Sequence, residues 1–83
     1  MKLPVIRHIH RTTSVEAIQH AIQVLENISE APSLKDEEHN VIGELISNLC
    51  GALEVHQMVA DGMQEKDACN AFMKKVMGSI DVK

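Results

Sequence analysis

Five histidines among 83 residues are the side chains of this sequence best suited to chemistry, because imidazole binds metals and exchanges protons near neutral pH. A metal site needs three or four ligands held together. His8 and His10 would lie on the same side of an extended segment, as a pair of ligands. The remaining histidines lie in separate segments, at His20, His39 and His56. We therefore expect no metal and no cofactor, and we keep a metal-binding helical protein as an alternative.

The acidic and nucleophilic residues lack the spacing of a catalytic site. The acidic pairs that begin at Glu37 and Glu65 fall at predicted helix starts, where carboxylates interact with the positive end of the helix dipole. Ser47 could be combined with His56 as nucleophile and base, but a serine inside a helix has no strained turn to expose it. Glycine-rich phosphate-binding motifs are absent from the sequence. We expect a non-enzymatic protein with no catalytic residue.

Cysteine use and hydropathy indicate the compartment. Cys50 and Cys69 are too few for a disulfide framework, and we expect both to be small buried apolar residues. No stretch approaches the roughly 20 apolar residues of a membrane span, and Pro4 and Arg7 interrupt what could be a signal peptide. We expect a cytoplasmic protein without membrane contact.

Charge is distributed unevenly along the chain, whose formal net charge is -4. Residues 1–13 hold three basic and no acidic side chains, whereas the rest holds five lysines and twelve acids. The segment around Gly62 could be a helix-turn-helix, but no arginine follows Arg11 and Phe72 is the sole aromatic residue. Specific base contacts mostly use arginine, and single strands stack on aromatic rings. Weak nucleic-acid binding is therefore our third hypothesis.

The first twelve residues predict an extended basic arm. Their apolar residues alternate with a period of two, and Pro4 restricts the segment to an edge strand or a lone arm. We expect the arm to dock on its own chain or on a partner through its basic residues, Lys2, Arg7 and Arg11.

Residues 13–83 predict one helical domain. Thr13 begins a capping box, Pro32 ends a first helix, and Gly62 ends a long second one. The predicted helices span residues 14–29, 34–60 and 64–77. We expect an all-α, antiparallel three-helix bundle in which the long helix is central.

The predicted 34–60 helix carries apolar side chains over about 180° of its surface, which is more than one neighbour covers. Gly43, Ser47 and Gly51 recur every four residues and allow close approach of another helix, either from the same chain or from a second copy. Val55 and Met58 emerge on the side that would otherwise be wet, and oligomerisation commonly stabilises a chain with little core. We predict a homodimer with these five residues at its interface.

Four segments resemble a family of short uncharacterised bacterial proteins: Ala31–Glu38, Val41–Asn48, Gly51–His56 and Asn70–Met73. The resemblance covers most of residues 31–81. It implies a small helical cytoplasmic protein, and it implies no activity, cofactor or functional residue.

The function most compatible with these patterns is a non-enzymatic module for protein–protein interaction or assembly. Its partner would be a second copy or a protein that the sequence does not identify. A helical protein that binds a small ligand or a metal is the alternative, through the histidines or the methionine-lined side of the 64–77 helix.

Overall fold

The computed structural model describes residues 2–81, with side chains to Val76. Within this range the chain is all-helical, which confirms the predicted class. It forms four helices and no strand: α1 (Leu3–Thr12), α2 (Val15–Ser29), α3 (Asp36–Ala60) and α4 (Glu65–Asp81). The helices α2, α3 and α4 overlap the three predicted from sequence.

The first segment is a helix, so the prediction of an extended arm is wrong and the predicted helix count is one short. Pro4 lies in the first turn of α1, where its fixed φ suits a helix and its missing N–H is not needed. Leu3, Ile6 and Ile9 are spaced by three and lie on one helical face, with Ile6 fully buried. In so short a segment the apolar residues fit both a period of two and a helical period.

Side-chain caps define where the next two helices begin. Ser14 precedes α2, and its hydroxyl accepts a hydrogen bond from the Ala17 amide at 3.2 Å. At the start of α3, the Glu38 carboxylate accepts from the Lys35 amide at 2.8 Å. Both bonds satisfy amides that have no partner inside the helix.

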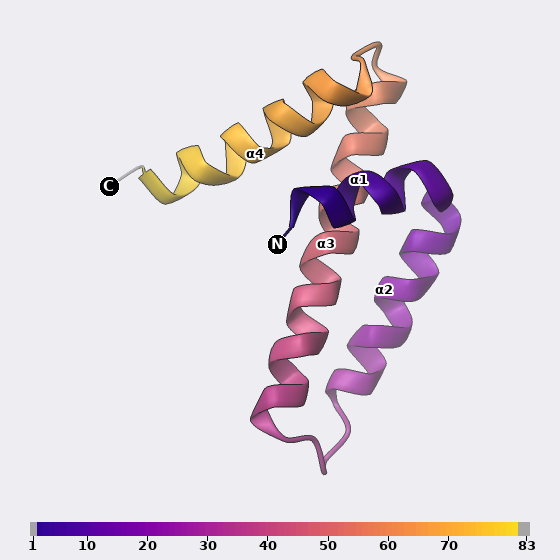
Figure 1. The fold of residues 1–83 in the computed structure, drawn as a ribbon. Coiled ribbons are helices and arrows are strands. Elements are labelled where there is room, and N and C mark those ends of the chain that lie inside the picture. The colour runs from indigo at the N-terminus through magenta and orange to yellow at the C-terminus, as the bar shows by residue number, and fades with distance from the viewer. Residues whose placement is uncertain (1, 82–83) are drawn as a thin grey trace.

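The helix α3 contacts each of the other three helices. In Figure 1, α2 and α3 lie side by side as a helical hairpin, α1 crosses α3, and α4 leads away from the end of α3. All four helices contribute to one small core, which consists of Ile6, Ile18, Ala52, Val55, Ala68, Cys69 and Phe72.

The closest approach between helices occurs at Gly51. A Cβ atom there would lie 2.8 Å from Ile6 Cδ1 and 3.0 Å from Phe72 Cζ, so the missing side chain lets α1 and α4 meet over α3. Gly43 is exposed, and a Cβ at that position would meet no atom within 4 Å in the described part of the chain. Of the small residues that recur every four positions, Gly51 is therefore a helix-packing site and Gly43 is not.

The predicted dimer contacts at Gly51 and Val55 are wrong, because both residues are buried within a single chain. Met58 is half-buried against the same core, and Ser47 is also half-buried. The apolar arc of α3 is wide because it packs against three helices of its own chain.

Replacing each glycine by leucine tests the packing at Gly51. We expect Gly51→Leu to lower the free energy of unfolding by about 3 kcal/mol, since a large side chain would separate α1 and α4 from α3. Gly43→Leu should change it by less than about 1 kcal/mol, with helix propensity in its favour. Urea unfolding followed by circular dichroism measures both. Equal stability of the two variants would contradict the close approach.

Candidate functional site

One stripe along α3 is apolar over most of its length and only partly covered. Its positions follow one another at spacings of four and three residues, as on one face of a helix; they are Val41, Leu45, Asn48, Ala52, Val55 and Val59. Asn48, Ala52 and Val55 are buried, whereas Val41 is 59% and Leu45 43% exposed. The part of the stripe that other helices shield from solvent therefore ends between Leu45 and Asn48.

The helix α1 marks this boundary. The Lys2 amide donates a hydrogen bond to Asn48 Oδ1 at 2.9 Å, which places the start of α1 at that point of α3. On the N-terminal side of Asn48, α1 does not lie over the stripe. In the first half of α3, Ile42 is buried, whereas the stripe residues Val41 and Leu45 stay exposed.

The helix α2 extends the same uncovered surface. Val24 is 55% and Ile28 43% exposed, and their spacing of four places them on one side of α2. Ile28 and Val41 line the same hollow, so the exposed residues of both helices face the same side of the hairpin. We call Val24, Ile28, Val41 and Leu45 the apolar face.

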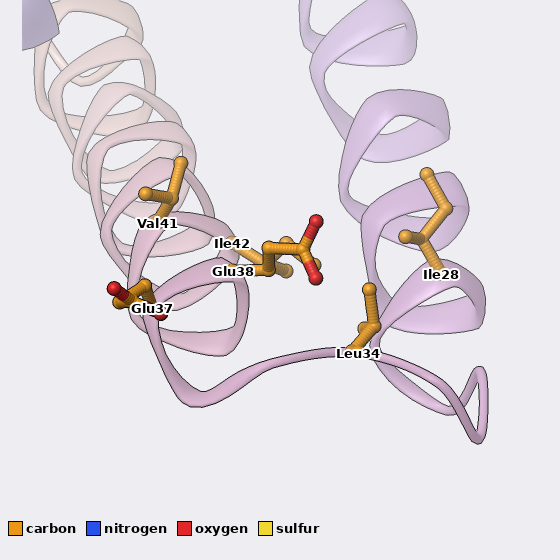
Figure 2. Close-up of a pocket in the computed structure, with 6 residues that line it drawn as sticks. All are labelled: Ile28, Leu34, Glu37, Glu38, Val41 and Ile42. Carbon is orange, nitrogen blue, oxygen red and sulfur yellow. The ribbon is translucent and has the colours of Figure 1, made fainter.

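A hollow of about 390 Å³ lies at the closed end of the hairpin, between the end of α2 and the start of α3. Figure 2 shows Ile28 and Leu34 opposite Ile42 and Val41, with the carboxylates of the first α3 turn beside them. Aliphatic side chains form most of its wall. The hollow can accept an apolar group, with the carboxylates of Glu37 and Glu38 at its wall.

A polar cluster joins the end of α1 to the start of α4. Arg11 binds the Glu65 carboxylate through two nitrogens, with Nη2 at 2.6 Å from Oε1 and Nε at 2.9 Å from Oε2. His10 Nδ1 lies 2.9 Å from Glu65 Oε2. Both oxygens of Glu65 are therefore engaged with α1.

His56 adds a contact from α3. Its Nε2 donates to the Thr13 carbonyl at 2.9 Å, because a carbonyl oxygen only accepts. Its ring lies 4.4 Å from the His10 ring, centroid to centroid, at an interplanar angle of 55°. The cluster thus connects α1, α3 and α4 at the junction with α2.

The hydrogen bonds from Arg11 and His10 lower the pKa of Glu65 to about 2. The same pairing with Glu65 raises the pKa of Arg11. Glu65 is consequently ionised throughout the physiological range and is unsuited to be a general acid. The geometry fits a structural role, in which the carboxylate orients α4 against α1.

Lys2 and Arg7, the other two residues predicted to dock the N-terminal segment, have different surroundings in the structure. Lys2 contributes its backbone amide to Asn48. Arg7 Nε is buried without a hydrogen-bond partner among the residues described. Sequence reasoning missed Glu65 as the partner of Arg11, because the two residues are 54 positions apart and only the fold brings them together.

The hypothetical catalytic and metal residues are not brought together. Ser47 and His56 are nine positions apart on α3, hence on opposite sides of the helix. In the helical conformation of α1, His8 and His10 do not share a side, so the arrangement described for an extended segment is not formed. Within the described range, no three His, Cys, Asp or Glu side chains are placed to hold a metal ion.

The two cysteines differ in their surroundings. Cys69 is buried in the core, as predicted, whereas Cys50 is exposed, which corrects the prediction for that residue. Desolvation, followed by the charges of Glu26 and Glu54, raises the pKa of Cys50. A thiol that stays protonated is a weak nucleophile. Neither cysteine forms a catalytic arrangement with the groups described above.

The Glu65 ion pair predicts how stability depends on pH. The pKa of Glu65 is depressed in the folded chain, so its stabilising contribution is present above about pH 4.5 and is lost as the pH falls toward 2. We expect Glu65→Gln to lower the melting temperature at pH 7 and to lose less stability between pH 4.5 and 2 than the wild type. Thermal unfolding across this range measures both effects.

The matched control is Glu30→Gln, which removes an exposed carboxylate outside the cluster. It should follow the wild-type pH profile. In Arg11→Ala, the Glu65 carboxyl resonance should titrate at a higher pH than in the wild type. An unchanged midpoint would contradict the assigned cause of the shift.

The comparisons with known proteins give a family and no activity. A family of unknown function, DUF6952, matches residues 1–81. No curated protein and no solved structure matches the chain. Among the described helices, none is both long and apolar enough to cross a membrane. The match extends over almost the whole length of the sequence, and the chain therefore belongs to the DUF6952 family of unknown function.

Proposed function

We propose that this chain is a small non-enzymatic assembly module that associates with a second copy of itself in the cytoplasm. The observation that carries the proposal is its surface area. A single chain exposes 5792 Å², whereas a compact monomer of 9.2 kDa exposes about 4900 Å². The surplus of about 900 Å² is close to the area that each partner buries in a standard protein interface, about 800 Å².

The shape of the chain supports the same conclusion. Its extents are 43 × 34 × 17 Å and its radius of gyration is 13.8 Å, compared with about 12 Å for a compact domain of this length. Because α4 leads away from the hairpin (Figure 1), the helices leave faces without neighbours. A flat chain with a small core gains apolar burial most directly by association.

The polar cluster supports a role without catalysis. Arg11 and His10 bind both oxygens of Glu65, and His56 binds a backbone carbonyl. These hydrogen bonds fix the positions of helices, and the groups concerned do not converge on a cavity. The two cysteines are free thiols, which suits a reducing compartment such as the cytoplasm.

Binding of a small apolar ligand is the second candidate function, and the hollow between α2 and α3 is the observation that favours it. Its volume is within the range of ligand pockets, and aliphatic side chains form most of its wall. This function would leave the rest of the apolar face uncovered, so we rank it below self-association.

Native mass spectrometry of the untagged chain tests the proposal, because a histidine tag would add metal ligands. We expect a dimer of about 18 kDa, twice the 9.2 kDa chain, at micromolar concentration. Dilution should convert it to monomer, as mass action requires.

A monomer without added mass at every concentration would overturn self-association. A monomer that retains a small organic molecule would support the second candidate function instead.

A further inference from the structure

We infer that the apolar face and the hollow beside it form a docking groove for a basic amphipathic helix of a partner protein. The apolar face consists of Val24, Ile28, Val41 and Leu45, which are 43–59% exposed in the single chain. This inference goes beyond the proposed self-association and does not depend on it.

The first step is the form of the surface. The helices α2 and α3 lie side by side (Figure 1), and the hollow of about 390 Å³ opens between the end of α2 and the start of α3. Ile28 and Leu34 form one wall of the hollow, and Val41 and Ile42 form the other (Figure 2). The other residues of the apolar face continue from the hollow along both helices. A groove of this kind receives a helix whose apolar side chains recur at spacings of three and four.

The second step is backbone chemistry, which selects a helix as the occupant. A chain laid on an apolar surface must pair its own N–H and C=O groups. The part of this chain that the structure describes has no strand whose edge could pair an extended peptide. A helix satisfies its backbone internally and leaves only its side chains to be accommodated.

The third step is charge, which selects a basic occupant. Residues 14–48, which comprise α2 and the first half of α3, hold seven acidic residues and one lysine. All seven acids are exposed, and apart from Glu44 none of them forms an ion pair within the described part of the chain. The net charge of the whole chain is -4, so its negative charge is concentrated here. Such a surface attracts a cationic partner and repels a copy of itself.

Two of these acids lie at the hollow itself. Glu37 and Glu38 line it together with the aliphatic side chains. One oxygen of Glu38 accepts a hydrogen bond from the Lys35 amide at 2.8 Å, and the other oxygen is left for a second donor. Because apolar and acidic groups meet at one site, the occupant must carry an apolar and a basic side chain about one helical turn apart.

A protein helix fits this surface better than a small cation or a membrane does. A small cationic ligand would fill the hollow and leave Val24 and Leu45 exposed, whereas a helix in the groove covers both. An anionic lipid surface is repelled by the same acids that attract a basic helix.

Fluorescence anisotropy of a synthetic peptide tests the inference on the untagged full chain. The probe is a fluorescein-labelled peptide of about 15 residues, with leucines at spacings of three and four and with lysines and alanines elsewhere. We expect a dissociation constant of about 10–100 µM at low salt. A scrambled peptide of the same composition should bind at least about tenfold more weakly, because it presents no apolar stripe. Equal binding of the two peptides, or no binding of the first, would overturn the inference.

Val41→Glu tests the apolar face, with Val15→Glu as its matched control. Both are exposed helical valines, 59% and 41% accessible, and Val15 lies nine positions from Val24, on the opposite side of α2. We expect Val41→Glu to weaken peptide binding at least about tenfold despite its added negative charge, because its carboxylate would be buried against leucines. Val15→Glu should not weaken binding. Circular dichroism checks that both variants fold, and equal affinities of the two would overturn the assigned groove.

Charge reversal tests the acidic wall of the hollow. Glu37 and Glu16 are both exposed, and each is the second residue of its helix. Glu37→Lys and Glu16→Lys therefore change the net charge and the interaction with the helix dipole equally. We expect Glu37→Lys to weaken peptide binding about fivefold at low salt and less at high salt, and Glu16→Lys to weaken it less than about twofold. Equal effects of the two reversals would mean attraction by net charge alone and would overturn the inference.

The outcomes separate this inference from the proposed function. A chain that is monomeric in native mass spectrometry, but binds the peptide with the pattern of variants described above, would overturn self-association and support the groove. A dimer whose affinity for the peptide is unchanged by Val41→Glu would support self-association and overturn the groove.

Discussion

The missing side chain at Gly51 is the constraint on which the arrangement of the helices depends. Ile6 from α1 and Phe72 from α4 both pack over this position, and a Cβ atom there would force them to shift. Glycine lowers helix propensity by about 1 kcal/mol in the middle of α3. The apolar contacts that it permits compensate for this loss, because they form much of the shared core. The close approach also brings the end of α1 near the start of α4.

The polar cluster follows from that approach. Arg11 and His10 reach Glu65 only because α1 lies against α3 at the point where α4 begins. Arg11 is largely exposed, and exposed ion pairs contribute little to stability. The cluster therefore fixes the direction of α4 more than it stabilises the chain, and the apolar core supplies most of the stability. His56 ties the same region to the link before α2 through Thr13.

Local signals in the sequence predict most of the helices and little of the site. The three-and-four spacing indicates α2, α3 and α4, whereas the cap predicted at Thr13 lies one residue before the observed cap, Ser14. The helix α1 is ambiguous, because ten residues with apolar positions at both periods do not distinguish a strand from a helix. The spacing of Gly43 and Gly51 indicates close packing, but it does not say which neighbour approaches. A contact such as the one between Arg11 and Glu65 cannot be predicted from the residues around either position, because the two are 54 positions apart.

The length of α1 explains why an apolar face remains open. Ten residues of helix span about 15 Å, whereas the 25 residues of α3 span about 37 Å. Because α1 crosses α3 near Asn48, it covers only the middle of the stripe, and α4 begins beyond its far end. The first half of α3 and the last half of α2 can therefore pack only against each other within the chain. In the described part of the chain, their remaining apolar side leaves Val41 59% and Leu45 43% exposed.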